Sequence, residues 1–79
     1  MFTRLKQLIA EIKEDPQLAS QWSDETDIIN DIGLDSLQVV TLLFKLEEVF
    51  DVEIDFDNFD YADLSAIGRL ADKLGIPDD

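Results

Sequence analysis

The stretch GLDSLQVVTLLFKLEEVF, residues 33–50, contains the strongest helical pattern in the chain. Residues 36–50 are predicted to form one helix, because a step of about 100° per residue gathers most of the apolar side chains into one arc. This arc is the predicted core face, and it holds Val39, Leu42, Leu43, Leu46, Val49 and Phe50. Gly33 permits the turn into the helix, and Asp35 or Ser36 can accept hydrogen bonds from its first free N–H groups.

The same helix has a second apolar arc beside the core face. Its members are Leu37, Val40 and Phe44, and its borders are Glu47 on one side and Thr41 and Glu48 on the other. A core helix in a small bundle rarely needs two apolar faces. Either this second arc packs on the preceding loop through Ile28 or Ile29, or it is exposed as a docking surface ringed by acidic side chains.

The segments before this helix are predicted to be another helix and a long loop. Apolar residues at helical spacing indicate an amphipathic helix over residues 3–14, and Pro16 marks its end. Residues 16–35 show no sustained period and are predicted to form a packed loop with scattered apolar anchors.

The segment after residue 50 is acidic and then helical again. Residues 52–57 alternate apolar and acidic side chains as a strand does, but a single strand has no partner here. We therefore expect an extended linker that leads into a short turn of helix near residues 57–61. A last helix, about Leu64–Leu74, has one apolar face and is closed by Gly75 and Pro77.

The length of 79 residues limits the chain to one domain with a modest core. No internal repeat or second domain is visible, so a single domain over residues 1–79 is expected. The predicted fold class is all-α. It is a small four-helix bundle with three longer helices, a short third helix, and the long loop between the first two.

The chain lacks both cysteine and histidine. The usual zinc ligands, thiolate nucleophiles and commonest general bases are therefore missing, so we expect neither a metal site nor an enzyme. Residues 1–14 carry three basic and two acidic side chains, whereas residues 15–63 carry fourteen acidic side chains and only Lys45. With a net charge of −13, the chain should repel nucleic acid and anionic membranes and attract basic protein surfaces. Charges near the N-terminus interrupt any run long enough for a signal peptide or a membrane span, which predicts a cytoplasmic protein.

Ser36 permits three interpretations. It can cap the helix, which contributes about 1 kcal/mol to stability. A nucleophilic role is disfavoured, because the nearby lysine, Lys45, lies about 13.5 Å of helical rise away, beyond hydrogen-bond reach. The third interpretation is modification by another enzyme. A phosphodiester on Ser36 would be favoured by the free N–H groups and the helix macrodipole, partly offset by Asp35, and Gly33 adds no side chain to obstruct access.

The motif D-I-G-L-D-S-L, residues 31–37, is followed by an apolar helix that ends in L-E-E-V-F, residues 46–50, and then by D-V-E-I-D. In this order the chain resembles the acyl carrier protein family. The likeness covers nearly the whole chain, because the helix order, the length and the acidity also agree. The resemblance implies that Ser36 receives 4′-phosphopantetheine from coenzyme A through a separate, magnesium-dependent phosphopantetheinyl transferase. The terminal thiol of that arm would carry an acyl or aminoacyl group as a thioester.

The resemblance also implies roles for the neighbouring residues. Asp35 matches the aspartate of the family motif and would contribute to docking of the transferase. The positions through which family members meet basic partner enzymes are matched by Leu37, Val40, Phe44, Glu47 and Glu48. We expect a monomer that meets the transferase and the acyl- or aminoacyl-loading and processing enzymes.

Three positions depart from the carriers of fatty acid synthases. Gln38 and Thr41 stand where acids are often found, and Lys45 stands where a small residue is often found. Fewer exposed acids weaken the steering toward generic basic docking sites. The motif also reads GLDSL rather than the GADSL frequent in primary fatty acid synthesis. We therefore favour a carrier of a polyketide, non-ribosomal peptide or related specialised pathway, with a fatty acid synthase carrier as the alternative.

Two other classes of function compete with the carrier. The acid-rich segment 51–63 could bind divalent cations, but an EF-hand alignment puts Phe56 at the turn glycine and Ala62 at the bidentate glutamate. Diffuse cation binding is the more plausible form of that hypothesis. The other class is an acidic interaction module that binds a partner through the second apolar arc without any cofactor.

Overall fold

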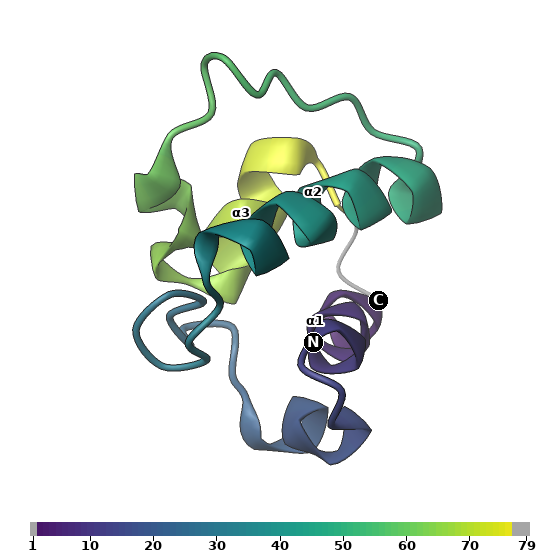
Figure 1. The fold of residues 1–79 in the computed structure, drawn as a ribbon, viewed down its shortest axis with the longest axis vertical. Helices are drawn as coiled ribbons and strands as arrows, with labels where there is room; N and C mark the ends of the chain where they lie inside the picture. Colours follow the sequence, from purple (N-terminus) through teal and green to yellow (C-terminus); the bar gives the residue numbers. More distant parts are fainter. Residues whose placement is uncertain (1, 77–79) are drawn as a thin grey trace.

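Every regular element that the structure describes is a helix. The computed structural model describes residues 2–76. Over these residues the elements are, in order, α1 (Thr3–Ile12), η1 (Pro16–Gln21), α2 (Ser36–Phe50), η2 (Tyr61–Ser65) and α3 (Ile67–Leu74), where η marks a short 3-10 helix (Figure 1). No strand occurs between residues 2 and 76. The predicted all-α class is confirmed, with η2 as the short third helix and η1 as an additional element inside the long loop.

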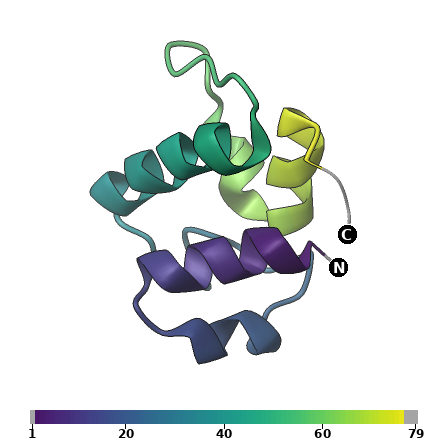
Figure 2. The same cartoon turned by 90° about the vertical axis from the view of Figure 1, so that its right-hand side faces the viewer.

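The core lies where α1, α2 and α3 meet. α1 has η1 on one side and α2 and α3 on the other, as the two views in Figure 1 and Figure 2 show. The largest fully buried side chains come from all three helices, the long loop and η2, and they are Leu5, Ile9, Ile28, Val39, Leu42, Leu46, Leu64, Ile67 and Leu70. Each such burial stabilises the fold by about 1.5–3 kcal/mol. The face of α2 that carries Val39, Leu42 and Leu46 therefore packs against the other helices, and the opposite face points to solvent.

α1 ends two residues earlier than the predicted range 3–14, at Ile12. Glu14 has a φ of 62°, in the left-handed region, so the chain has already left the helix there. The left-handed Glu14 closes the helix in a Schellman motif, because the N–H of Glu14 donates to the carbonyl oxygen of Glu11 and the N–H of Asp15 to that of Ala10, both at 3.0 Å. The side chain of Asp15 then accepts a hydrogen bond from the N–H of Gln17 (3.3 Å) and starts η1.

The segment between α2 and α3 differs most from the prediction. η2 begins where the helix predicted near residues 57–61 was expected to end. Its start is set by Asp60, whose carboxylate accepts a hydrogen bond from the N–H of Ala62 at 2.8 Å. α3 begins after Ala66 rather than at Leu64, because Ala66 is extended (φ −155°, ψ 143°) and separates the two helices.

One residue of the predicted core face of α2 is misassigned. Val49 is 45% exposed, so its assignment to the core is wrong. It lies at the edge of the predicted arc, where a small change in helix direction decides between core and solvent. Phe50, also predicted for the core, packs against it while half-buried, and the guanidinium carbon of Arg4 lies 5.2 Å from the centroid of its ring.

Candidate functional site

The N-terminus of α2 is held by two reciprocal hydrogen bonds. Asp35 Oδ1 accepts from the backbone N–H of Gln38 at 2.8 Å, and Gln38 Oε1 accepts from the backbone N–H of Asp35 at 3.1 Å. This capping box satisfies two N–H groups, one of them a helical N–H that has no partner within the helix. The preceding turn uses Gly33 at a φ of 82°, which only glycine adopts without strain. The start of α2 is therefore fixed by residues on both sides of Ser36.

Ser36 is the first residue of α2, and its side chain is exposed. The interpretation of Ser36 as the helix cap is wrong, because Asp35 occupies the capping position and makes the capping hydrogen bond. Among residues 2–76, the Ser36 hydroxyl has no hydrogen-bond partner. The structure thus leaves this oxygen accessible and uncommitted.

The surroundings of Ser36 fit a bulky phosphodiester. The hydroxyl stands at the N-terminus of a helix of 15 residues, where backbone N–H groups and the macrodipole stabilise negative charge. A Cβ placed on Gly33 would meet no heavy atom within 4 Å, so the space beside the turn that precedes Ser36 is open. The carboxylate of Asp35 opposes a second negative charge, but its acceptor oxygen is turned into the first turn of the helix by the capping box.

The second apolar arc is exposed along α2. Leu37 is 75% exposed, Val40 37% and Phe44 57%. Ile28, one of the two loop residues considered as partners of this arc, is fully buried in the core instead. Of the two alternatives raised by the sequence, the structure supports the exposed surface.

The two glutamates at the borders of this arc differ in their contacts. Glu48 is exposed, whereas Glu47 is half-buried and its Oε2 accepts a hydrogen bond from the N–H of Ile54 at 3.0 Å. Glu47 therefore ties the segment after α2 back to the helix. Nothing in the sequence pattern indicated this contact, because it joins positions outside any helical repeat.

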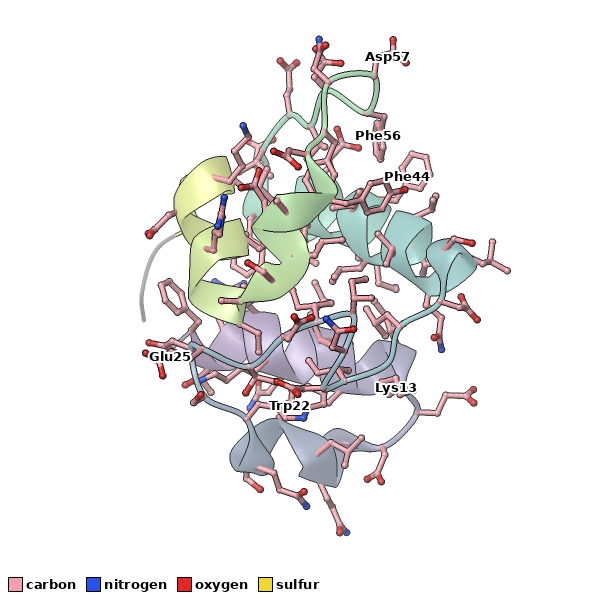
Figure 3. All side chains as sticks on the ribbon, turned by 90° about the vertical axis from the view of Figure 1, so that its left-hand side faces the viewer. Lys13, Trp22, Glu25, Phe44, Phe56 and Asp57 are labelled. Carbon is pink, nitrogen blue, oxygen red and sulfur yellow. The ribbon has the colours of Figure 1, made fainter. Side chains whose placement is uncertain are left out.

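Phe56 is a site residue that the sequence placed only in a linker. Its ring lies against the ring of Phe44, with 5.1 Å between the centroids and 39° between the planes, and Figure 3 shows it reaching toward α2 from the loop. The alternation of residues 52–57 gave a weak signal that Phe56 shares a side with Ile54, but Ile54 is buried and Phe56 is 41% exposed.

Two features are missing from the part of the chain that the structure describes. Between residues 2 and 76, no group of three or more acidic side chains is arranged to hold a metal ion. Over the same range, no helix has both the length and the apolar character needed to cross a bilayer.

Comparison with known proteins agrees with this geometry. Residues 3–74 match the family described as a phosphopantetheine attachment site, which is defined by covalent 4′-phosphopantetheine. The chain is similar to the acyl carrier protein of Campylobacter concisus, with 36% identity over 86% of each chain. It is also similar to the acyl carrier protein of Syntrophus aciditrophicus, with 39% identity over 71% of this chain and 64% of the relative.

A third relative is the mitochondrial acyl carrier protein of Saccharomyces cerevisiae, with 40% identity over 78% of this chain. The match spans about half (49%) of the length of that yeast protein. The family match covers most of the described residues and includes the whole of α2 and both segments that flank it. The chain belongs to the acyl carrier protein family, whose members are carriers of covalently held groups and not enzymes.

Proposed function

We propose that Ser36 is the residue to which 4′-phosphopantetheine is attached. One observation at the start of α2 carries this proposal. Asp35 makes the capping hydrogen bond, and the Ser36 hydroxyl is exposed and has no hydrogen-bond partner among residues 2–76. When attached, the group supplies a terminal thiol for holding an acyl or aminoacyl cargo, and this chain has no cysteine of its own.

The residues at the start of α2 and along its exposed face have separate roles in this proposal. The N–H groups at the start of α2 stabilise the phosphodiester, and the capping box keeps that end of the helix in place. Leu37, Val40 and Phe44 offer apolar contact to partner enzymes, which include the transferase and acyl-processing enzymes. Glu47 and Glu48 steer basic surfaces toward them by charge. Asp35 stands beside the modified hydroxyl and contributes to transferase docking as well as to the cap.

We infer that the carrier serves a specialised pathway of the polyketide or non-ribosomal peptide kind, with a fatty acid synthase carrier as the alternative. The inference rests on three non-acidic positions on α2, which are Gln38, Thr41 and Lys45. The Gln38 side chain is engaged in the capping box, and the Thr41 hydroxyl donates to the carbonyl oxygen of Leu37 at 3.1 Å. Lys45 is exposed and adds a positive charge. A surface with fewer acids favours dedicated partners over generic basic ones.

Three further expectations stay predictions. They are the single domain over residues 1–79, the monomeric state and the cytoplasmic location. The mass of the protein recovered from its native host, with any thioester preserved, would identify the cargo and so decide between the two kinds of pathway.

The test of the attachment site uses the intact mass of the protein. Wild type, Ser36→Ala and Ser65→Ala are incubated with coenzyme A, magnesium and a broad-specificity phosphopantetheinyl transferase. Ser65 is an exposed serine on η2 and provides the matched control. Wild type and Ser65→Ala should gain the mass of one phosphopantetheine, and Ser36→Ala should gain none. An unmodified wild type beside a working positive control would refute the proposal.

A further inference from the structure

Phe44 and Phe56 form an aromatic pair that belongs to two different segments. Phe44 lies on the exposed face of α2, and Phe56 lies in the loop that follows the helix. Their rings are in contact, yet Phe44 is 57% and Phe56 41% exposed. Large aromatic side chains that touch each other and still face solvent are typical of protein-binding surfaces, where they supply much contact area at a low cost in conformational entropy.

The loop holds Phe56 in place through its two neighbours. Ile54 is buried, and its N–H donates to Glu47 on α2 at 3.0 Å. Asp55 closes a turn around Phe56, because its Oδ1 accepts from the N–H of Asp57 at 3.1 Å and its Oδ2 accepts from the side-chain amide of Asn58 at 2.7 Å. The hydrogen bond from Asn58 also lowers the pKa of Asp55. Phe56 is thus presented at a fixed position beside Phe44.

The charge on the loop that carries Phe56 has a single sign, whereas Lys45 lies next to Phe44 on α2. No lysine or arginine occurs between Lys45 and Arg69. The loop itself carries five exposed acidic side chains, which are Asp51, Glu53, Asp55, Asp57 and Asp60. Such a rim repels a second copy of this chain and anionic membranes, and it attracts a protein surface rich in lysine and arginine.

The position of the pair relative to Ser36 indicates which basic protein uses it. Ser36, Val40 and Phe44 follow one another at four-residue intervals and so share one side of α2. The helical rise from Ser36 to Phe44 is about 12 Å. A standard interface covers roughly 800 Å² on each partner, which is roughly 30 Å across. The aromatic pair is therefore within the reach of an enzyme whose active centre meets the Ser36 hydroxyl.

We propose that the phosphopantetheinyl transferase that modifies Ser36 recognises Phe44 and Phe56 together as one docking element. The matching pocket on the transferase is apolar, wide enough for two rings, and rimmed by basic side chains that face Asp55 and Asp57. Recognition thus extends from α2 onto the loop, and Phe56 is a specificity-determining residue for the modification. This inference rests on the proposed attachment at Ser36.

The test is the steady-state kinetics of a broad-specificity phosphopantetheinyl transferase with this protein as the varied substrate. Phe56→Ala should raise KM about tenfold, as expected when an interface residue worth about 1.4 kcal/mol is truncated, and leave kcat unchanged. Phe56→Tyr keeps the ring and should behave as wild type. Val49→Ala is the matched control, because Val49 is an exposed apolar residue of α2 outside the pair, 45% exposed, and it should leave KM unchanged.

The contact between the rings gives a second measurement. If the transferase binds the two rings as one element, the effects of Phe44→Ala and Phe56→Ala on KM should be non-additive. The KM of the double variant should then be close to the higher of the two single-variant KM values. A wild-type KM for Phe56→Ala, with wild type fully modified, would overturn this inference and leave attachment at Ser36 intact. Failure of wild type to be modified at all would overturn both. Thermal melting of each variant measures the fraction of unfolded protein in the assay. A KM that rises only in proportion to that unfolded fraction also counts against the inference.

Discussion

The carboxylate of Asp35 and the side-chain amide of Gln38 close the first turn of α2 in both directions, at 2.8 and 3.1 Å. Ser36 lies between these two residues and takes no part in the hydrogen bonds. Asp35 and Gln38 therefore stabilise the start of the helix, and the hydroxyl of Ser36 is left free for modification. This separation permits modification of Ser36 without loss of the helix cap.

Replacing Asp35 by alanine should lower the free energy of unfolding by about 1 kcal/mol, since a helix N-cap with a side-chain acceptor contributes about that much. Urea unfolding followed by circular dichroism measures the change. Asp57→Ala is the matched control, because Asp57 is an exposed aspartate whose side chain accepts no hydrogen bond from residues 2–76. Equal stability of the two variants would show that the capping box contributes nothing in solution.

Replacing Ser36 by alanine should change the free energy of unfolding by less than about 0.5 kcal/mol. The hydroxyl has no partner to lose among the described residues, and alanine is the better helix former. The same urea titration, run beside Asp35→Ala, compares two adjacent positions under one set of conditions. A loss near 1 kcal/mol for Ser36→Ala would mean that the serine shares the cap with Asp35.

The features that sequence reasoning predicted are local or periodic. The turn at Gly33, the polar start of α2 and the two apolar arcs of the helix depend on residues close together in the chain, so pattern and spacing suffice. The predicted end of α1 is two residues too late, because the left-handed residue that closes the helix is Glu14, and a glutamate does not mark a helix end as a glycine does.

The features that were missed are contacts between segments. The pairing of Phe44 with Phe56 and the hydrogen bond from Ile54 to Glu47 join a helix to a loop whose path no periodicity describes. Asp60 is a good N-cap residue and could have indicated the start of η2. The prediction instead placed a short helix near residues 57–61, directly after the alternating residues 52–57. Exposure of Val49 depends on where α2 stands relative to the other helices, which its own sequence does not encode.

The two faces of α2 should respond very differently to truncation. Leu46→Ala should lower the free energy of unfolding by about 2–5 kcal/mol, because Leu46 is fully buried and its loss leaves a cavity. Leu37→Ala, the same chemical change at a residue that is 75% exposed, should cost less than about 0.5 kcal/mol. Chemical unfolding of both variants checks the assignment, and a comparable loss for the two would place the second arc in the core.

The carboxylate of Asp27 should make a contribution to stability that disappears in acid. Its Oδ1 accepts from the backbone N–H groups of Asn30 and Ile29, both at 2.8 Å, and its Oδ2 accepts from the side-chain amide of Asn30 at 3.0 Å. These hydrogen bonds, led by the backbone N–H of Asn30, lower the pKa of Asp27 below its ordinary value of 3.8. A carboxyl whose pKa is lower in the folded than in the unfolded state stabilises the fold above the unfolded pKa, and this stabilisation is lost as the pH falls through the folded pKa.

Comparing wild type with Asp27→Asn isolates this effect from the other acidic groups. The variant cannot ionise at this position, so wild type should exceed it in unfolding free energy at about pH 7, and the gap should shrink toward about pH 3 as Asp27 takes up its proton. Asp57→Asn removes the same unit of charge from an exposed position and controls for the reduced net charge. Urea titrations at both pH values provide the measurement. A gap of the same size at neutral and acidic pH would show that the hydrogen bonds to Asp27 do not depend on its charge.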